Sequence, residues 1–272
     1  MNSPGRGGSV LKPPVLHPAG AGFGMKLTDG GTHISRTMML AEIGRVLTAV
    51  PGCASRDDYA AAVLERNVTG KSTDSTRKKT LRHLRELYGL SLELPIFTAF
   101  RSLALHTPGA LPQLALLVAW ARDPLLRAST VPLLTATPGK VVEKSALEAA
   151  IEATFPNHYS ALNIAKIARN ASASWSQSGH LTGHATKVRT ALVAAPAALC
   201  LALLLGHAEG RSGEELFRSP WCRLLDLTPE RARAVAVQAH REGLLDMKAI
   251  GSVVEVAFPK FQDLLAKAHE HH

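Results

Sequence analysis

Residues 228–258, TPERARAVAVQAHREGLLDMKAIGSVVEVAF, decide the fold of the C-terminal part of the chain. Thr228 followed by Pro229 predicts the start of a helix, and Gly243 predicts its end. Two alternating apolar segments then flank a turn at IGS, which predicts a β-hairpin. Because residues 214–226, EELFRSPWCRLLD, supply a preceding helix, this order is typical of a winged helix.

A second unit of this kind lies in the N-terminal half. Residues 55–67, SRDDYAAAVLERN, predict a helix with Ser55 as its N-cap. After a turn at VTGKS, residues 73–89, TDSTRKKTLRHLRELYG, predict a basic helix that Gly89 ends. A helix, a turn and a basic helix are the outline of a helix-turn-helix unit.

The rest of the chain reads as a helical body. The chain has 272 residues, is 46% hydrophobic and only 5% aromatic, and is rich in Ala and Leu, which favours helices over a β-sandwich. Between residues 95 and 155, apolar helical segments are separated by prolines. In ARDPLLRAS, Asp123 is expected to cap a helix and to form an ion-paired corner with Arg122 and Arg127.

The predicted fold class is therefore mainly α: a helical bundle with a helix-turn-helix-like N-terminal unit and a winged-helix-like C-terminal unit with a small β-hairpin. Four regions are expected along the chain. They are a flexible Gly/Pro-rich arm (1–30), an N-terminal helical domain with the helix-turn-helix-like unit (31–155), a C-terminal helical domain with the winged-helix-like end (156–265) and a tail (266–272).

The net charge and the cysteines indicate which partner and which cellular compartment to expect. The net charge of +9 makes a polyanion the first partner to consider. Cys53, Cys200 and Cys222 lack metal-site spacing and read as reduced small hydrophobes of a cytoplasmic protein, and no secretory signal is recognisable. The uncharged segment 190–206 is short for a membrane span and is interrupted by Pro196, so it is expected to be a buried core helix.

The basic helix is the first candidate for contact with DNA. Its cations are opposed locally only by Asp74 and Glu86, although a run of positive charge can also be just a solvated helix face. The candidate DNA-binding residues here are Lys71, Thr76, Arg77, Lys78, Lys79, Arg82 and Arg85.

The second candidate is NASASWSQSGHLTGHATKVR, residues 170–189, which contains no acid. A helix beginning near Ser176 or Ser178 would bury Leu181, Ala185, Val188 and Leu192 and turn a row of donor groups outward. Alternatively, Trp175 fills the core and the remainder is a solvated helix. The candidate DNA-binding residues here are Ser174, Trp175, Ser176, Gln177, Ser178, His180, Thr182, His184, Lys187 and Arg189.

Two chemical alternatives use the same stretch. Ser178 with His180 or His184 would suit a hydrolase or nuclease, but no acid occurs between Glu152 and Glu209 and no G-x-S-x-G turn is present. An acid from elsewhere in the fold would keep this alternative open. His180 and His184 have the spacing of helical metal ligands but lack the glutamate of H-E-x-x-H. No catalytic residue, metal ligand or cofactor is assigned.

Four segments carry a resemblance to a known family. They are KLTDGGTHISRTMMLAEI (26–43), ERNVTGKSTDSTRKKTLRHLRELYGL (65–90), LLVAWARDPLLRAS (116–129) and SASWSQSGHLTG (172–183) with the KVR that follows. With these segments the chain resembles the BrxA-type proteins of BREX bacteriophage-exclusion systems, a family once labelled as inner-membrane proteins. The likeness covers most of residues 26–190 and brings no catalytic residues with it.

The resemblance implies a helical, cytosolic, non-enzymatic accessory protein that binds DNA. Such a protein works beside the methyltransferase, phosphatase-like and ATPase components of the defence system and not in the membrane. Together with the charge pattern, it predicts binding to double-stranded DNA, mainly through phosphates. The alternative is an adaptor whose helical faces dock protein partners, with the charge serving solubility.

Overall fold

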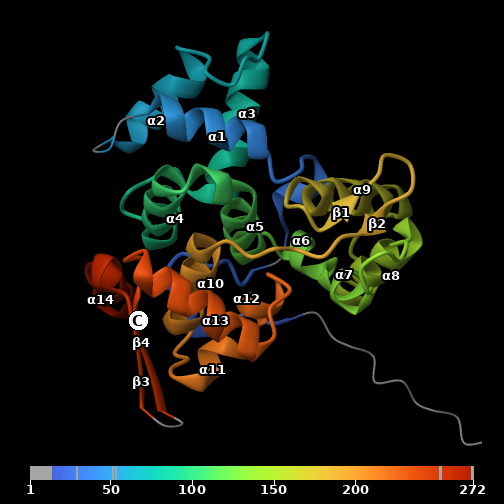
Figure 1. Cartoon of the computed structure of the whole chain (residues 1–272). Coiled ribbons are helices and arrows are strands. Elements are labelled where there is room, and N and C mark those ends of the chain that lie inside the picture. The colour runs from blue at the N-terminus through green and yellow to red at the C-terminus, as the bar shows by residue number, and fades with distance from the viewer. Residues whose placement is uncertain (1–13, 29, 51, 53, 251–252, 271–272) are drawn as a thin grey trace, which may run out of the picture.

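The computed structural model describes residues 14–28, 30–50, 52, 54–250 and 253–270. The chain is mainly helical, with two small antiparallel sheets of two strands each (Figure 1). This part of the predicted fold class is confirmed. The core arises because apolar side chains recur at helical spacing on nearly every helix and are withdrawn from water together.

The first three long helices form a lobe at one end of the molecule (Figure 1). They are α1 (Leu40–Ala49), α2 (Arg56–Leu64) and α3 (Asp74–Tyr88). The Ser55 side chain accepts a hydrogen bond from the Asp58 N–H and caps α2, and α3 is followed by Gly89 in a positive-φ conformation, so both predicted boundaries are confirmed. Helix α2 packs against α1 and α3, which places α3 along the side of the lobe.

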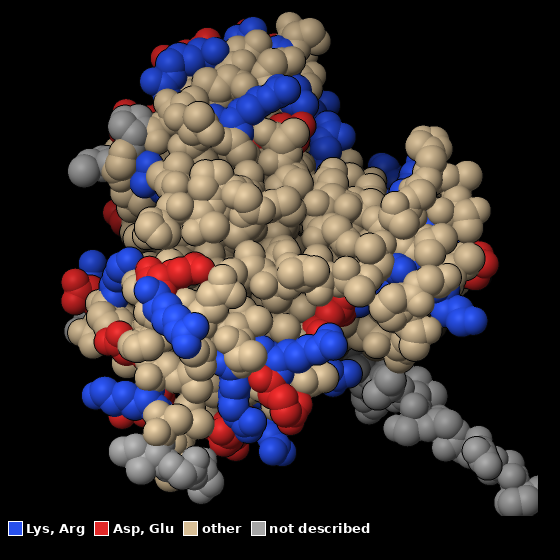
Figure 2. Space-filling view, in the orientation of Figure 1, with Lys and Arg blue, Asp and Glu red and all other residues tan. Residues whose placement is uncertain are grey.

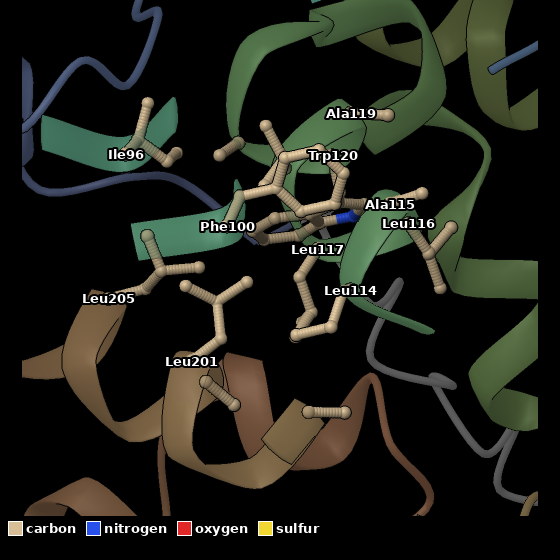
Figure 3. Close-up of a cluster of buried hydrophobic side chains, with 14 of the residues drawn as sticks. Ile96, Phe100, Leu114, Ala115, Leu116, Leu117, Ala119, Trp120, Leu201 and Leu205 are labelled. Carbon is tan, nitrogen blue, oxygen red and sulfur yellow. The ribbon is translucent and has the colours of Figure 1, made fainter. Parts of the chain in front are cut away.

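Three helices from distant parts of the sequence meet in the centre. They are α4 (Pro95–His106), α5 (Leu111–Arg122) and α10 (Pro196–Ala208). Figure 3 shows Trp120 of α5 among Phe100 of α4 and Leu201 and Leu205 of α10. The Trp120 Nε1 donates a hydrogen bond to Thr130 Oγ1 at 2.8 Å, so its one polar atom is satisfied inside the core.

The uncharged segment 190–206 supplies α10, which is buried on nearly all sides as expected. Among the described residues, no helix has both the length and the apolar character needed to cross a bilayer. Cys200 on this helix and Cys222 are free and buried, as predicted, whereas Cys53 lies outside the described residues.

A second lobe carries short helices and the smaller sheet (Figure 1). Its elements are α6 (Pro124–Ala128), α7 (Thr130–Thr135), α8 (Lys144–Thr154), α9 (Ala161–Gln177), β1 (Leu181–Thr182) and β2 (Val188–Arg189). Helix α9 packs on α8 and on the 3-10 helix η2 (Thr32–Ile34).

The C-terminal end has the predicted order of elements, except that the single helix expected over residues 214–226 is divided in two, because Ser219 caps a new helix that starts at Pro220. After α11 (Glu214–Phe217) and α12 (Pro220–Arg223) come α13 (Pro229–Arg241), β3 (Asp246–Ile250) and β4 (Val253–Ala257). Thr228 caps α13 through its side chain, and β3 pairs antiparallel with β4, with Lys248 opposite Glu255. The predicted helix and hairpin are therefore confirmed.

Both ends of the described chain correct an expectation. Residues 14–28, expected to belong to a flexible arm, pack onto the body: Phe23 is fully buried, and the Ile96 N–H donates to the Phe23 carbonyl at 2.9 Å. Apolar residues without periodicity can still be fixed by such backbone bonds, whereas residues 1–13 lie outside the described residues. Residues 266–270, expected as a tail, complete α14 (Gln262–Glu270), which packs on α4.

Candidate nucleic-acid interface

The basic face of α3 follows from how the helix is anchored. Its apolar side is buried, with Leu84 and Leu87 fully enclosed, and the Tyr88 hydroxyl donates to the Met38 carbonyl. Its opposite side therefore faces solvent, and it carries the exposed residues Lys78, Lys79 and Arg82 at positions i, i+1 and i+4. Helical spacing predicts that Lys78, Arg82 and Arg85 share one side of the helix; Lys78 and Arg82 are exposed, whereas Arg85 is partly buried.

Two other cations predicted for this face serve the fold of the lobe. The Lys71 ammonium lies 2.7 Å from Glu42 Oε1 on α1. The Arg77 guanidinium donates to the carbonyls of Lys71 and Leu64 and lies 3.5 Å from Asp74. These bonds close the loop between α2 and α3, so neither side chain is as available as the exposed three. Thr76 is half-buried, with its hydroxyl 2.9 Å from that of Thr73.

A cleft of about 360 Å³ runs beside the exposed cations. Its lining residues are Lys26, Leu64, Lys78, Leu81, Arg82, Arg85 and Glu86. Burial lowers the pKa of Arg85, and neighbouring Arg56 lowers it further. The Arg85 Nε is buried without a hydrogen-bond partner among the described residues. The cleft thus concentrates positive charge from two chain segments.

Lys26 reaches this cleft from the N-terminal segment that the sequence analysis assigned to a flexible arm. Burial lowers its pKa, as does Arg122, whereas Glu86 and Asp123 raise it. Glu86, the acidic residue of the cleft lining, accepts a hydrogen bond from Thr32 Oγ1 at 3.0 Å and lies 3.9 Å from the Arg82 Nε. Sequence reasoning missed Lys26, and the Gly30-Gly31 pair that follows it was the available signal.

The α3 surface continues towards α9 through residues 35–37. Burial lowers the pKa of His83 on α3, and nearby Arg36, which is exposed, is among the other groups that lower it. The next residue, Thr37, accepts a hydrogen bond from Gln177 Nε2 at 3.3 Å. This contact joins the segment before α1 to the C-terminal end of α9, where part of the second predicted contact surface lies.

The predicted helix over the second half of residues 170–189 is wrong. Helix α9 extends through Gln177, and residues 181–189 form the β1–β2 hairpin, with Leu181 opposite Arg189. Two glycines explain the change. Gly179 has φ +89°, which ends the helix, and Gly183 has φ +90° and would place a Cβ 2.2 Å from the Thr186 carbonyl oxygen. A tight hairpin turn therefore replaces the expected helix.

Half of the contact residues predicted in this stretch are buried, so they cannot meet DNA at the surface. The Trp175 Nε1 donates to Ser129 Oγ at 2.8 Å, which makes this tryptophan part of the core. Arg189 pairs with Asp226. The buried residues are Ser174, Trp175, Ser178, His180 and Arg189; those at least partly exposed are Ser176, Gln177, Thr182, His184 and Lys187.

Ser178 and His180 do form a hydrogen-bonded pair, with Ser178 Oγ 2.8 Å from His180 Nδ1. His180 Nε2 donates to the Leu224 carbonyl at 2.7 Å, and burial lowers the pKa of His180 to about 4, so the ring is neutral at pH 7. Both side chains are enclosed, so a substrate could not reach the hydroxyl without rearrangement. His184 is exposed in the hairpin turn, away from this pair.

A second serine and histidine belong to a chain that sequence reasoning missed. His33 Nδ1 lies 2.8 Å from Asp123 Oδ2, and His33 Nε2 lies 2.8 Å from Ser174 Oγ. The Ser174 hydroxyl also accepts the Met38 N–H and lies within hydrogen-bond distance of the Asn170 carbonyl. All three members are buried, and the chain ties η2, the α5–α6 corner and α9 together.

The expected ion-paired corner is wrong in its partners. Asp123 caps α6 through the Leu125 and Leu126 N–H groups, as predicted, but the side chain that its Oδ2 contacts is His33. Arg122 donates to the Gly24 and Glu86 carbonyls, and Arg127 donates to the carbonyls of Trp120, Ala121 and Lys26. The two arginines therefore hold neighbouring backbone segments in place.

Figure 2 shows Lys and Arg side chains on the lobe that carries α1–α3 and in the hollow between this lobe and the lobe of α9. The middle of the same face carries few charged groups. Among the described residues, no three His, Cys, Asp or Glu side chains are grouped to hold a metal ion. No protein-family model matches the chain, and no curated protein matches it.

Proposed function

We propose that the protein binds double-stranded DNA through α3 and the hollow beside it, mainly by phosphate contacts. The observation that carries this proposal is the exposed row Lys78, Lys79 and Arg82, which is continuous with the cationic cleft. Lysine and arginine at adjoining exposed positions of one helix neutralise successive phosphates and release counterions. In this proposal, α2 and α3 act as a helix-turn-helix-like unit.

The hollow suits a duplex because both of its sides carry hydrogen-bond donors. Arg36 and Gln177 lie between α3 and α9, and the exposed turn with His184 and Lys187 projects from the second lobe. Within the described residues of this turn, 182–187, no carboxylate opposes a phosphate. These groups can donate hydrogen bonds to phosphate oxygens, which are the same at every base pair. The expected binding therefore depends only weakly on the DNA sequence.

The cellular role that we propose is that of a DNA-binding accessory in a BREX-type anti-phage defence system. Its support is the resemblance of residues 26–190 to BrxA-type proteins. Two of the segments that carry this resemblance contain the basic helix and Ser174–Trp175. In this chain Trp175 is part of the core, because its Nε1 donates a hydrogen bond to Ser129 Oγ. The proposed partners are DNA and the methyltransferase, phosphatase-like and ATPase components, and the protein itself is not an enzyme.

A mobility-shift titration with a duplex of about 20 base pairs tests DNA binding at two salt concentrations. Affinity is expected to fall steeply, by about 10²-fold or more between 50 and 200 mM salt, if several phosphates are contacted. The variant Lys78→Glu/Arg82→Glu is expected to lose binding. The control Lys260→Glu/Lys267→Glu makes the same charge change at exposed positions near the C-terminus and is expected to bind normally. Absence of duplex binding at low salt would contradict the proposal.

A second candidate function, protein docking, is favoured by the C-terminal unit. Its helix α13 exposes Val237, and Val253 at the start of β4 is 70% exposed, beside acidic Glu230 and Glu255. Exposed apolar groups mixed with both charge signs suit a protein partner better than DNA. In this reading, the winged-helix-like unit is an adaptor surface. Loss of defence in Val237→Glu with normal duplex affinity would support it.

A further inference from the structure

The cleft beside α3 is not isolated, because a second pocket of about 340 Å³ adjoins it at Lys26 and Glu86. This pocket is lined by Lys26, Thr28, Gly30, Gly31, Thr32, Glu86, Arg122 and Pro124. The two pockets together therefore form a recess that leads from the exposed face of α3 to residues 26–28 and 30–32.

The recess is strongly cationic. Its described lining includes five cations, Lys26, Lys78, Arg82, Arg85 and Arg122, against the carboxylate of Glu86, and the buried carboxylate of Asp123 lies behind Gly31. The Glu86 carboxylate is already in contact with Thr32, His83 and Arg82. Arg122 donates its hydrogen bonds to backbone carbonyls, which carry no net charge and do not neutralise it. Burial lowers its pKa to about 10, so the guanidinium stays protonated at pH 7.

Lys26 is the central group because it lines both pockets. Its main chain is fixed: the Lys26 N–H donates to the Ala121 carbonyl at 3.0 Å, and its carbonyl accepts from Arg127. Its ammonium, in contrast, makes no hydrogen bond or ion pair with any residue that the structure describes. Burial and Arg122 together disfavour the charged ammonium more than Glu86 and Asp123 favour it, so a further anion beside Lys26 would be stabilising.

We propose that this recess is a seat for a phosphate monoester, with Lys26 as its main contact. A monoester carries a charge near −2 at pH 7 and has three terminal oxygens, so it can use several converging donors, whereas a bridging phosphodiester carries −1. A recess also admits a chain end or a small molecule more easily than the middle of a duplex backbone. The ligand class is thus the 5′-terminal phosphate of a nucleic acid or a free nucleotide.

The exposed Thr28 side chain also suits such a ligand, because it lies at the rim and supplies a hydroxyl donor. The proposal goes beyond duplex binding because the seat does not require α3 to contact a duplex.

The test compares the intact protein with Lys26→Met, which keeps an apolar stem, and with the control Lys267→Met on α14. Thermal unfolding is followed with inorganic phosphate or dAMP, each against chloride at equal ionic strength. Phosphate and dAMP are expected to raise the Tm of the wild type and of Lys267→Met but not that of Lys26→Met. A rise with dAMP alone identifies a nucleotide as the ligand. Equal rises in all three proteins overturn the seat.

A second measurement separates the seat from the proposed duplex contact. Two duplexes that differ only in a 5′-phosphate or a 5′-hydroxyl are titrated at one salt concentration. The wild type is expected to prefer the phosphorylated ends by about tenfold, and Lys26→Met to bind the two duplexes with equal affinity. Duplex binding without a preference for the phosphate, and without a Tm response, overturns the seat and leaves the proposed function standing. A rise in Tm with phosphate but no duplex binding supports the seat and contradicts the proposed function.

Discussion

His33 Nδ1 and Asp123 Oδ2 lie 2.8 Å apart at a site where neither side chain is more than 1% exposed. The two residues are 90 positions apart in the sequence, and the contact fixes the segment before α1 to the α5–α6 corner. That segment begins near Lys26 and continues to Arg36, so the same bond positions both sides of the candidate interface. A buried carboxylate is costly to leave without its hydrogen-bond partner.

Replacing Asp123 by Asn is therefore expected to destabilise the protein by about 3–5 kcal/mol at pH 7. Burial alone would raise the pKa of Asp123, but His33 and the N–H groups of Leu126 and His33 outweigh it and lower the pKa. The stability from this carboxylate is thus present above its unfolded pKa and lost as the pH falls below about 4. Urea unfolding of the variant at pH 7 and pH 3 should show a gap from wild type that shrinks on acidification. A gap independent of pH would contradict the assignment.

His180 predicts a second, separate pH dependence. Because burial lowers its pKa to about 4, the unfolded chain binds a proton at a pH where the folded chain does not. The stability due to the neutral ring is therefore complete above about pH 6.5 and declines as the pH falls to about 4, by up to about 3 kcal/mol. The free energy of unfolding of His180→Gln, measured across this range, should approach that of wild type at the acidic end. Parallel curves would be the contrary outcome.

A substitution of Trp175 shows whether this residue stabilises the core or contacts DNA. Trp175→Phe removes the hydrogen bond to Ser129 Oγ and leaves that hydroxyl buried, so a loss of about 1–3 kcal/mol is expected. Duplex affinity should stay within about twofold of wild type, because the indole is fully buried and a small loss of stability does not alter the surface. Denaturant unfolding and mobility shift on the same preparations check both values. A tenfold loss of duplex affinity would indicate that Trp175 contributes to the DNA interface.

The exposed row on α3 predicts a graded salt dependence. Lys78→Ala and Lys79→Ala should each weaken binding for all duplex sequences alike and reduce the slope of log affinity against log salt by about one. Lys71→Ala is the informative comparison, because its ammonium is already paired with Glu42. It should leave the slope unchanged while lowering stability slightly. Equal slopes for all three variants would indicate that α3 does not face the phosphates.

Sequence pattern was sufficient where structure is local. Thr228 with Pro229, Asp123 with Pro124, and Ser55 each cap the helix expected of them, because a cap depends on a few neighbouring backbone groups. The β3–β4 hairpin was predictable from alternation around a short turn. Helical periodicity predicted a common side for Lys78, Arg82 and Arg85, and two of these, Lys78 and Arg82, are exposed.

The same reasoning failed between residues 178 and 189. Helical spacing of Leu181, Ala185 and Val188 predicted a stripe, but two positive-φ glycines impose a hairpin at Gly179 and Gly183. Composition also misassigned residues 14–28, because lack of periodicity says nothing about backbone bonds to distant partners. His33, Asp123 and Ser174 carry no local sign of their chain, since each is an ordinary residue until the fold brings them together.

The sequence by itself therefore determined most of the helices, the caps at Ser55, Asp123 and Thr228, the terminal hairpin and the exposed positions of Lys78 and Arg82, since these follow from spacing along one segment. Only the tertiary structure decided which polar residues are buried and which cations meet. Ser174 and Trp175 are buried because their polar atoms form hydrogen bonds in the core, to His33 and Ser129. Lys26 joined the α3 cations because backbone bonds to Ala121 and Arg127 hold it there. Such long-range pairing depends on the packing of the whole chain, which no local pattern encodes.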